Sequence, residues 1–133
     1  MLAPVVMSVY TRLEHFKKAI TALQENSLAI KSNLIIFSDA ASCDSDIELV
    51  ENVRLHAKTI DGFRTVTLIE RPHNMGGVNN ALKGLLQVVK IFKKAIFLED
   101  DIVTAPGFLA FMNQALEFYK DDSSVTSITG YSP

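Results

Sequence analysis

The chain has 133 residues, of which 48% are hydrophobic and 21% charged, a balance that indicates one globular domain over residues 1–133 and excludes wholesale disorder. Thirteen Lys and Arg against fifteen Asp and Glu leave a net charge of −2, which argues against a dedicated nucleic-acid binder. Cys43 is the only cysteine, which excludes an intrachain disulfide and a cysteine-based metal cluster and favours a reducing, cytoplasmic compartment. No stretch approaches the ~20 apolar residues of a transmembrane segment, and the first ten residues lack the features of a secretory signal.

Apolar periodicity predicts an alternation of strands and helices along the chain. Short β-branched apolar runs predict five strands, at residues 5–10, 33–37, 65–69, 94–98 and 125–129. Apolar residues at helical spacing follow each of the first four strands and predict four helices. This alternation indicates an α/β fold, and right-handed crossovers favour a three-layer sandwich with a mainly parallel sheet and helices on both faces.

Local signals set the expected helix starts. Thr-Arg-Leu-Glu at 11–14 and Ser-Asp-Ile-Glu at 45–48 each fit a capping box, in which two side chains bond to unpaired amides. Met75-Gly76-Gly77 breaks the chain before the third helix, and Pro106 suits the first turn of the fourth.

Polar residues directly after the strands are the candidate site residues. In parallel α/β sheets the ligand binds beyond the carboxyl ends of the strands, where the strand order reverses. The segments at these ends are Tyr10-Thr11-Arg12, Ser38-Asp39, residues 70–77 and Glu99-Asp100-Asp101.

The acidic triplet Glu99-Asp100-Asp101 is the sharpest chemical signal. Three carboxylates at one strand end repel one another unless a positive group or water compensates them. A hard divalent cation, Mg²⁺ or Mn²⁺, prefers oxygen ligands and would resolve the conflict while leaving positions for water and phosphate. A strand end that is simply solvated is the alternative interpretation.

Several other α/β families lack support in this sequence. A phosphorylated receiver domain needs an acidic pair after its first strand, and a dehalogenase-type phosphatase needs Asp-x-Asp there, where this chain has Tyr-Thr-Arg. The chain also lacks a G-x-x-x-x-G-K-[ST] loop and a G-x-G-x-x-G sequence after the first strand.

Five segments together resemble a known family. They are PVVMSVYTR, NLIIFSDA, ERPHNMGGVNNAL, AIFLEDDIVTAPGFLAFMNQALEFYKDD and SITGYSP, in that order. They resemble the nucleotide-sugar-binding half of bacterial GT-A-type glycosyltransferases, family-2-like members of surface polysaccharide synthesis, some of which carry a haemolysin-like label. The resemblance covers nearly the whole chain, and the strand with its acidic triplet and the following Pro-x-Phe-Leu helix is its most specific part.

The resemblance implies a role for each matching residue. The triplet with Glu99 would be the DXD element, with Asp101 a ligand of the Mn²⁺ or Mg²⁺ that bridges the donor diphosphate, and Asp100 near the ribose or donor sugar. Asp39 would face the base or ribose, and the backbone of Tyr10, Thr11 and Arg12 would flank the base. His73, Asn74 and Gly76 fall where the family's Asn-x-Gly turn approaches the nucleotide.

Two local departures and the chain length distinguish this sequence from the family pattern. Ala40 to Cys43 stand where relatives have a Gly-Pro type of turn, and Gly77 replaces an aliphatic residue. A complete enzyme also needs an acceptor-binding half that supplies the catalytic base. We therefore expect a truncated donor-binding domain whose base lies beyond residue 133, and whose exposed apolar surface favours self-association.

The sequence predicts a glycosyltransferase domain that binds a nucleotide-diphosphate sugar for transfer to a glycan or lipid-linked acceptor, in the cytoplasm or peripherally at the inner face of the membrane. The alternatives are a non-catalytic nucleotide-sugar-binding or assembly module and a sugar nucleotidyltransferase, which would need a glycine-rich basic loop after the first strand. Three residues also have purely structural interpretations: His73 as a solvent-facing loop residue, Asp39 as a turn cap and Arg12 as a surface residue.

Overall fold

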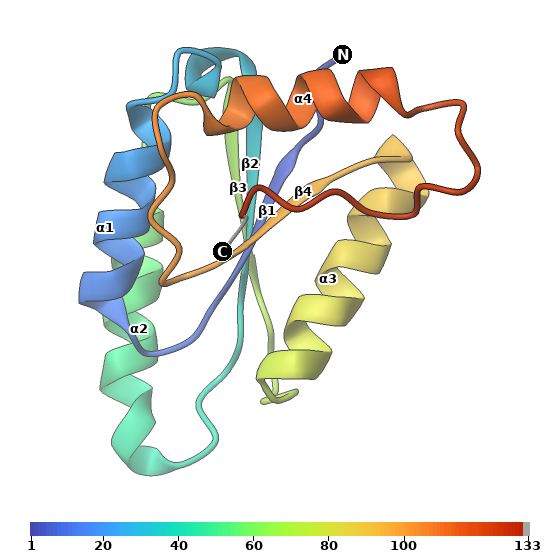
Figure 1. Ribbon diagram of the computed structural model, residues 1–133. Coiled ribbons are helices and arrows are strands. Elements are labelled where there is room, and N and C mark those ends of the chain that lie inside the picture. The colour runs from blue at the N-terminus through green and yellow to red at the C-terminus, as the bar shows by residue number, and fades with distance from the viewer. Residues whose placement is uncertain (132–133) are drawn as a thin grey trace.

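The computed structural model describes residues 1–131, which form a sheet between layers of helices (Figure 1). The strands are β1 (Val5–Val9), β2 (Asn33–Ser38), β3 (Thr65–Glu70) and β4 (Ile96–Glu99). The helices are α1 (Leu13–Gln24), α2 (Ile47–Ala57), α3 (Gly77–Phe92) and α4 (Phe108–Phe118), with short 3₁₀ turns at Ala29–Lys31 and Asp44–Asp46.

The four strands are all parallel and lie in the order β3-β2-β1-β4. Helices α1 and α2 cover one face of the sheet and α3 covers the other (Figure 1). The chain steps outward from β1 to β3, and α3 then returns it to the far side of β1. The predicted α/β class with a parallel sheet between helices is confirmed, and the strand order reverses between β1 and β4.

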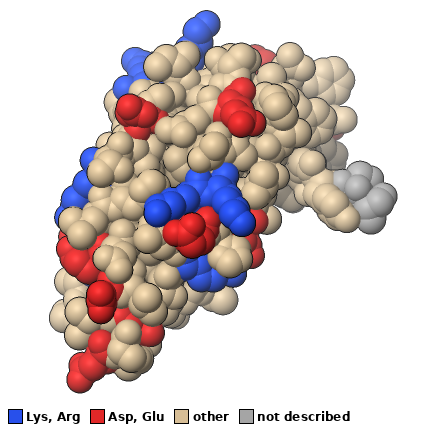
Figure 2. Space-filling model, turned by 90° about the vertical axis from the view of Figure 1, so that its left-hand side faces the viewer, with Lys and Arg blue, Asp and Glu red and all other residues tan. Residues whose placement is uncertain are grey.

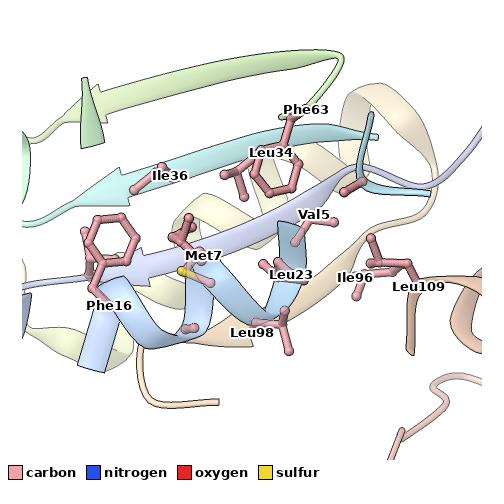
Figure 3. Close-up of a cluster of buried hydrophobic side chains, with 14 of the residues drawn as sticks. Val5, Met7, Phe16, Leu23, Leu34, Ile36, Phe63, Ile96, Leu98 and Leu109 are labelled. Carbon is pink, nitrogen blue, oxygen red and sulfur yellow. The ribbon is translucent and has the colours of Figure 1, made fainter. Parts of the chain in front are cut away.

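Side-chain alternation along β1 divides the hydrophobic core between the two faces. Val5 and Met7 point toward α1, where they pack with Phe16 and with residues of β2 and β4 (Figure 3). Val6 points to the opposite face and packs with Phe37 and Val88 under α3. All of these side chains except Val88 are 0–1% exposed, so the central strand is buried on both sides, as its continuous apolar run predicts.

Helix α4 is fixed at the amino end of β1 by two side-chain amides. Asn113 of α4 accepts a hydrogen bond from the Ala3 N–H at 2.8 Å. Asn26, only 3% exposed, accepts one from the Leu109 N–H at 2.9 Å, which satisfies an amide in the first turn of α4. Leu109 and Met112 then complete the core on the α1 side.

The face formed by α1 and α2 carries both signs of charge. Figure 2 shows basic side chains around acidic ones in the middle of this face, and acidic side chains along its lower end, where α2 begins. Asp44 and Asp46 precede α2 and Glu48 lies in its first turn. Acidic groups at this position are stabilised by the positive end of the helix dipole.

The prediction of a fifth strand at 125–129 was wrong. Within the described residues this segment contains no strand, and the Val125 N–H bonds only locally, to the Asp122 carbonyl. Ile128 still packs against the core. The apolar pattern therefore reflects a partly buried side chain that packs on the core, whereas a strand also requires a partner for its backbone groups.

Both predicted capping boxes were wrong as well. The residues that cap α1 and α2 are Arg12 and Asp46, and neither cap makes a side-chain hydrogen bond to the helix. Pro106 precedes α4, which begins two residues later at Phe108. In α1 the Phe16 N–H bonds to the Arg12 carbonyl, so Arg12 closes the first turn with its backbone and keeps its side chain for other partners.

We expect Gly84→Ala to destabilise the fold. A Cβ at Gly84 would lie 2.7 Å from Cδ2 and 2.8 Å from Cγ of Phe37, so α3 has no room for a methyl group where it crosses β2. Overpacking of this kind costs roughly 1–3 kcal/mol. Urea denaturation measures the loss, and Gly77→Ala, whose Cβ would meet no heavy atom within 4 Å, is the matched control. Equal stabilities of the two variants would contradict this packing.

We also expect stability to fall in mild acid because of His56. Its ring lies edge-on to Phe16 at 5.6 Å, and its Nε2 is buried without a partner among the described residues. Burial, and then the charge of Lys17, lower the pKa of His56 below its ordinary value of 6.5. The unfolded chain therefore binds this proton more readily, and stability is lost as the pH falls below about 6.5.

The pKa of Glu70 is lowered from 4.5 by its hydrogen bond with Lys58. The stability that this ion pair contributes is therefore lost only at more acidic pH. Urea unfolding at pH 7.5 and pH 5.5 isolates the effect of the histidine. Between pH 7.5 and pH 5.5, the free energy of unfolding is expected to fall less in His56→Gln than in the wild type. The same loss in both proteins would exclude His56 as the cause.

Candidate functional site

The candidate site is a cavity of about 420 Å³ at the carboxyl ends of β1 and β4, where the strand order reverses. Its walls come from three elements: the end of β1, the start of α3 and the end of β4. The lining residues are Ser8, Val9, Tyr10, Thr11, Arg12, Gly77, Val78, Asn80, Ala81, Phe97, Glu99 and Asp100. Parallel pairing of β1 with β4 is what brings the two polar strand ends together, because it sets Ser8 opposite Glu99.

Arg12 binds the acidic segment across this junction. Its guanidinium donates to both oxygens of Asp100, through Nη2 and, at 3.4 Å, through Nε. Nη1 donates to Oδ2 of Asp101 at 3.3 Å. The hydrogen bond and charge of Asp100, followed by those of Asp101, raise the pKa of the Arg12 guanidinium. The cation that offsets the acidic triplet is therefore a residue of this chain, and Arg12 is more than a surface side chain.

The three carboxylates of the triplet have different environments. Glu99 ends β4 and is exposed, without an ion-pair partner among residues 1–131. The Asp100 side chain is 5% exposed and is held by Arg12 on both oxygens. The Asp101 side chain is 36% exposed, contacts Arg12 through one oxygen only, and lines a second, apolar cavity of about 690 Å³ beside the first.

Asp39 connects the end of β2 with the loop before α3. It is 2% exposed, and its Oδ1 accepts hydrogen bonds from the Ala40 and Met75 N–H groups, each at 2.9 Å. Its Oδ2 accepts from Nδ2 of Asn74 at 3.3 Å, and the same amide donates to the Ala40 carbonyl at 2.8 Å. The predicted pair Asp39 and Asn74 thus lies together, with the carboxylate engaged in holding the loop.

The same loop enters α3 through Gly76. This residue has φ +81° and ψ 149°, a conformation that is essentially restricted to glycine. Its carbonyl accepts the Asn80 N–H, which starts the helix at the cavity wall. His73 is exposed and, like Asp39, Asn74 and Gly76, is absent from the cavity lining. The candidates that line the cavity are Tyr10, Thr11, Arg12, Glu99 and Asp100.

Tyr10 fixes the loop after β2. Its hydroxyl donates to Oδ2 of Asp46 at 2.6 Å and accepts the Ser42 N–H at 3.0 Å. Thr11 lines the cavity beside it, and its carbonyl accepts the Leu13 N–H. The segment Tyr10 to Arg12 therefore forms part of the cavity wall, while the side chains of Tyr10 and Arg12 bind elements on either side.

Sequence reasoning missed a buried polar network below the cavity. Asn80, 0% exposed, donates to Ser8 Oγ at 3.0 Å and to the Phe37 carbonyl at 2.9 Å. It accepts from Nε of Arg71 at 3.0 Å, and the Arg71 guanidinium stacks over Phe37 at 4.8 Å. The available signal was the position of Asn80 on the same helical face as Gly84 and Val88, which face the sheet.

Arg54 of α2 is a second residue that was missed. Its Nη2 donates to the carbonyls of Ser38, Asp39 and Arg71 at 3.0–3.3 Å. These carbonyls lie at or directly after the ends of β2 and β3, and that of Ser38 also accepts the Arg71 N–H at 2.8 Å. The sequence signal was its place in the helix beside the buried Val53.

The site offers few protein ligands to a divalent cation. Among residues 1–131 no three His, Cys, Asp or Glu side chains converge to hold a metal. Glu99 and Asp101 are the accessible carboxylates, and Oδ1 of Asp101 is unbonded to any described residue. Mg²⁺-type ions commonly bind through one or two carboxylates and substrate phosphates, keeping water as the remaining ligands. The donor set therefore fits a cation that is bound together with a phosphate ligand, and does not fit a closed protein site.

The fold is similar to that of a known glycosyltransferase, TarS of S. aureus, in two crystal structures. One TarS structure matches with a TM-score of 0.59 and 13% identity, over 98% of this chain and 23% of the TarS chain. A structure of TarS residues 1–349 matches with a TM-score of 0.62 and 12% identity, over 97% of this chain and 38% of that TarS chain. The chain thus has a glycosyltransferase-like fold and spans less than two fifths of either TarS chain.

No protein-family model matches the chain, and no curated protein sequence does so either. None of the helices within residues 1–131 combines the length and hydrophobicity that crossing a bilayer requires.

We expect Asp39→Asn to loosen the loop before α3. The variant keeps one oxygen acceptor and turns an N–H₂ group either toward the Asn74 donor or, with the amide flipped, toward the N–H groups of Ala40 and Met75, which costs about 1–3 kcal/mol. Urea denaturation measures the loss, and amide exchange at Met75 is expected to accelerate. Asp44→Asn, an exposed acid, is the control. Unchanged Met75 exchange would show that Asp39 does not hold the loop.

Proposed function

We propose that the cavity between β1 and β4 binds a nucleotide-diphosphate sugar, and that the chain is the donor-binding domain of a GT-A-type, family-2-like glycosyltransferase. The observation that carries the proposal is the meeting of Arg12 with Asp100 and Asp101 at the point where the strand order reverses. The glycosyltransferase-like fold supports the reaction class.

Two positive groups at the cavity suit an anionic ligand, although the acids beside them outnumber the one guanidinium. α3 begins at the wall with Gly77 and has no acidic residue in its first turn. Its first N–H groups lack partners within the helix, and its dipole adds positive potential at the same place. Arg12 contributes a guanidinium, which matches phosphate oxygens bidentately. Both groups would stabilise the negative charge that develops on the diphosphate as the glycosidic bond breaks.

The remaining candidates are assigned to the other parts of the donor. The backbone of Tyr10 to Arg12 would flank the base. Asp39 and Asn74, which hold each other, would form the side toward the base or ribose, with Gly76 and His73 in the same loop. Glu99 and Asp100 would lie near the ribose or donor sugar.

Asp101 would hold Mn²⁺ or Mg²⁺ together with the diphosphate. When bound, the ion supplies Lewis-acid stabilisation of the leaving group. The catalytic base is not assigned to any residue of this chain, and we propose that it lies beyond residue 133. The acceptor would be a glycan or lipid-linked glycan of a surface polysaccharide, and the reaction would take place in the cytoplasm or at the inner face of the membrane.

One observation favours a second candidate, a non-catalytic nucleotide-sugar-binding module. One of the two acids that line the cavity is engaged, because Arg12 holds Asp100 on both oxygens, which leaves that carboxylate unsuited to accept a proton. Donor hydrolysis or transfer by a longer form of the chain would separate the two functions, because the module would bind the donor without turning it over.

Isothermal titration with UDP-, GDP- and ADP-sugars in Mn²⁺ tests the proposal. We expect one class to bind, and Asp101→Ala to weaken that binding roughly tenfold or more, because charge-assisted contacts of this kind are worth about 1.5–3 kcal/mol. Asp44→Ala, which removes an exposed acid at the start of α2, is expected to bind normally. Failure of every nucleotide sugar to bind would refute the proposal.

A further inference from the structure

Arg12 is placed to compete with a cation for the acidic pair. Within residues 1–131 it is the only basic side chain in contact with Asp100 or Asp101. Its Nη1 lies 3.3 Å from Oδ2 of Asp101, the more accessible of the two carboxylates. A divalent ion that ligates Asp101 would meet this positive charge at close range, and the repulsion between them opposes binding.

The guanidinium is also exposed enough to exchange its weaker partner. The Arg12 side chain is 49% exposed, whereas that of Asp100 is 5% exposed. Arg12 precedes α1 and caps it with its backbone carbonyl, so its side chain can turn without disturbing the hydrogen bond that closes the helix. The contact to Asp101 is a single hydrogen bond, while the contact to Asp100 uses two nitrogens. Asp101 is therefore the partner that Arg12 gives up most easily.

We infer that Arg12 is an internal counter-cation that keeps Asp101 from binding a divalent ion alone, and that a nucleoside diphosphate releases Asp101 by giving the guanidinium another anion. This rests on the proposed function. The exchange is chemically balanced, because phosphate oxygens replace the carboxylate as acceptors of the guanidinium N–H groups. The cation and the diphosphate then bind cooperatively, each favouring the arrangement that the other needs.

Binding of Mn²⁺ alone tests this role of Arg12 without any measurement of activity. Free Mn²⁺ is followed by electron paramagnetic resonance in low salt, with the wild type, Arg12→Gln and Arg12→Lys. We expect Arg12→Gln to bind Mn²⁺ roughly tenfold tighter than the wild type, and Arg12→Lys to fall between them. The lysine variant keeps a positive charge but loses the two-nitrogen contact, so it also provides a result if the glutamine variant does not fold.

Two controls separate local competition from a general effect of charge. Lys17→Gln removes the same charge from α1, where Lys17 pairs with Glu14 at 3.4 Å, and is expected to leave Mn²⁺ binding unchanged. Asp101→Asn added to Arg12→Gln is expected to abolish the gain. Equal binding by wild type and Arg12→Gln, an equal gain in Lys17→Gln, or a gain that survives Asp101→Asn would each overturn the inference.

Uridine diphosphate supplies the second arm. It is expected to strengthen Mn²⁺ binding by the wild type more than by Arg12→Gln, since the variant has no cation to release. Equal strengthening in both would overturn the coupling. If the Mn²⁺ arm succeeds and no nucleotide or nucleotide sugar binds, the proposed function fails while the competition at Asp101 stands.

Discussion

The ion pairs of Arg12 join the ends of two neighbouring parallel strands, and the chemistry of the whole crevice depends on this junction. Three consecutive carboxylates at a strand end are unfavourable alone. The ladder between β1 and β4 places a guanidinium beside two of them. Three acids and one guanidinium still leave two negative charges. Arg12 therefore reduces the repulsion among the carboxylates in the folded protein without fully neutralising the site.

The crevice is held open by polar side chains that satisfy the ends of the sheet. Asp39 binds two loop amides, Asn80 binds across β1 and β2, and Arg54 binds three carbonyls from the other face. These side chains bond to backbone groups at and just beyond the strand ends. The loops that follow β2 and β3 are therefore bonded to side chains from both helical layers.

The class of fold could be predicted because it follows from apolar periodicity, which the four true strands and four helices obey. Segment 125–129 obeys the same pattern and is not a strand, since pairing depends on where the rest of the chain lies. The capping boxes failed for a related reason. A Ser or Thr before a helix offers a cap, but at α1 the first turn is closed by the Arg12 backbone.

The candidate site was predictable in position and only partly in its interactions. Polar residues after parallel strands must lie at one edge of the sheet, so Tyr10 to Arg12 and Glu99 to Asp101 were expected together. The sequence could not reveal that the Asp39 carboxylate would accept hydrogen bonds from Met75 and Asn74, or that the Arg12 side chain would bind the acidic triplet. Such pairings depend on side-chain direction and on register, which spacing along one chain does not encode.

The floor of the crevice has a consequence for any titration of ligand binding. Asn80 and Ser8 have no ionisable group, so the hydrogen bond between their side chains does not depend on the protonation state of either residue. A change of ligand affinity with pH would accordingly have its origin outside this pair of side chains.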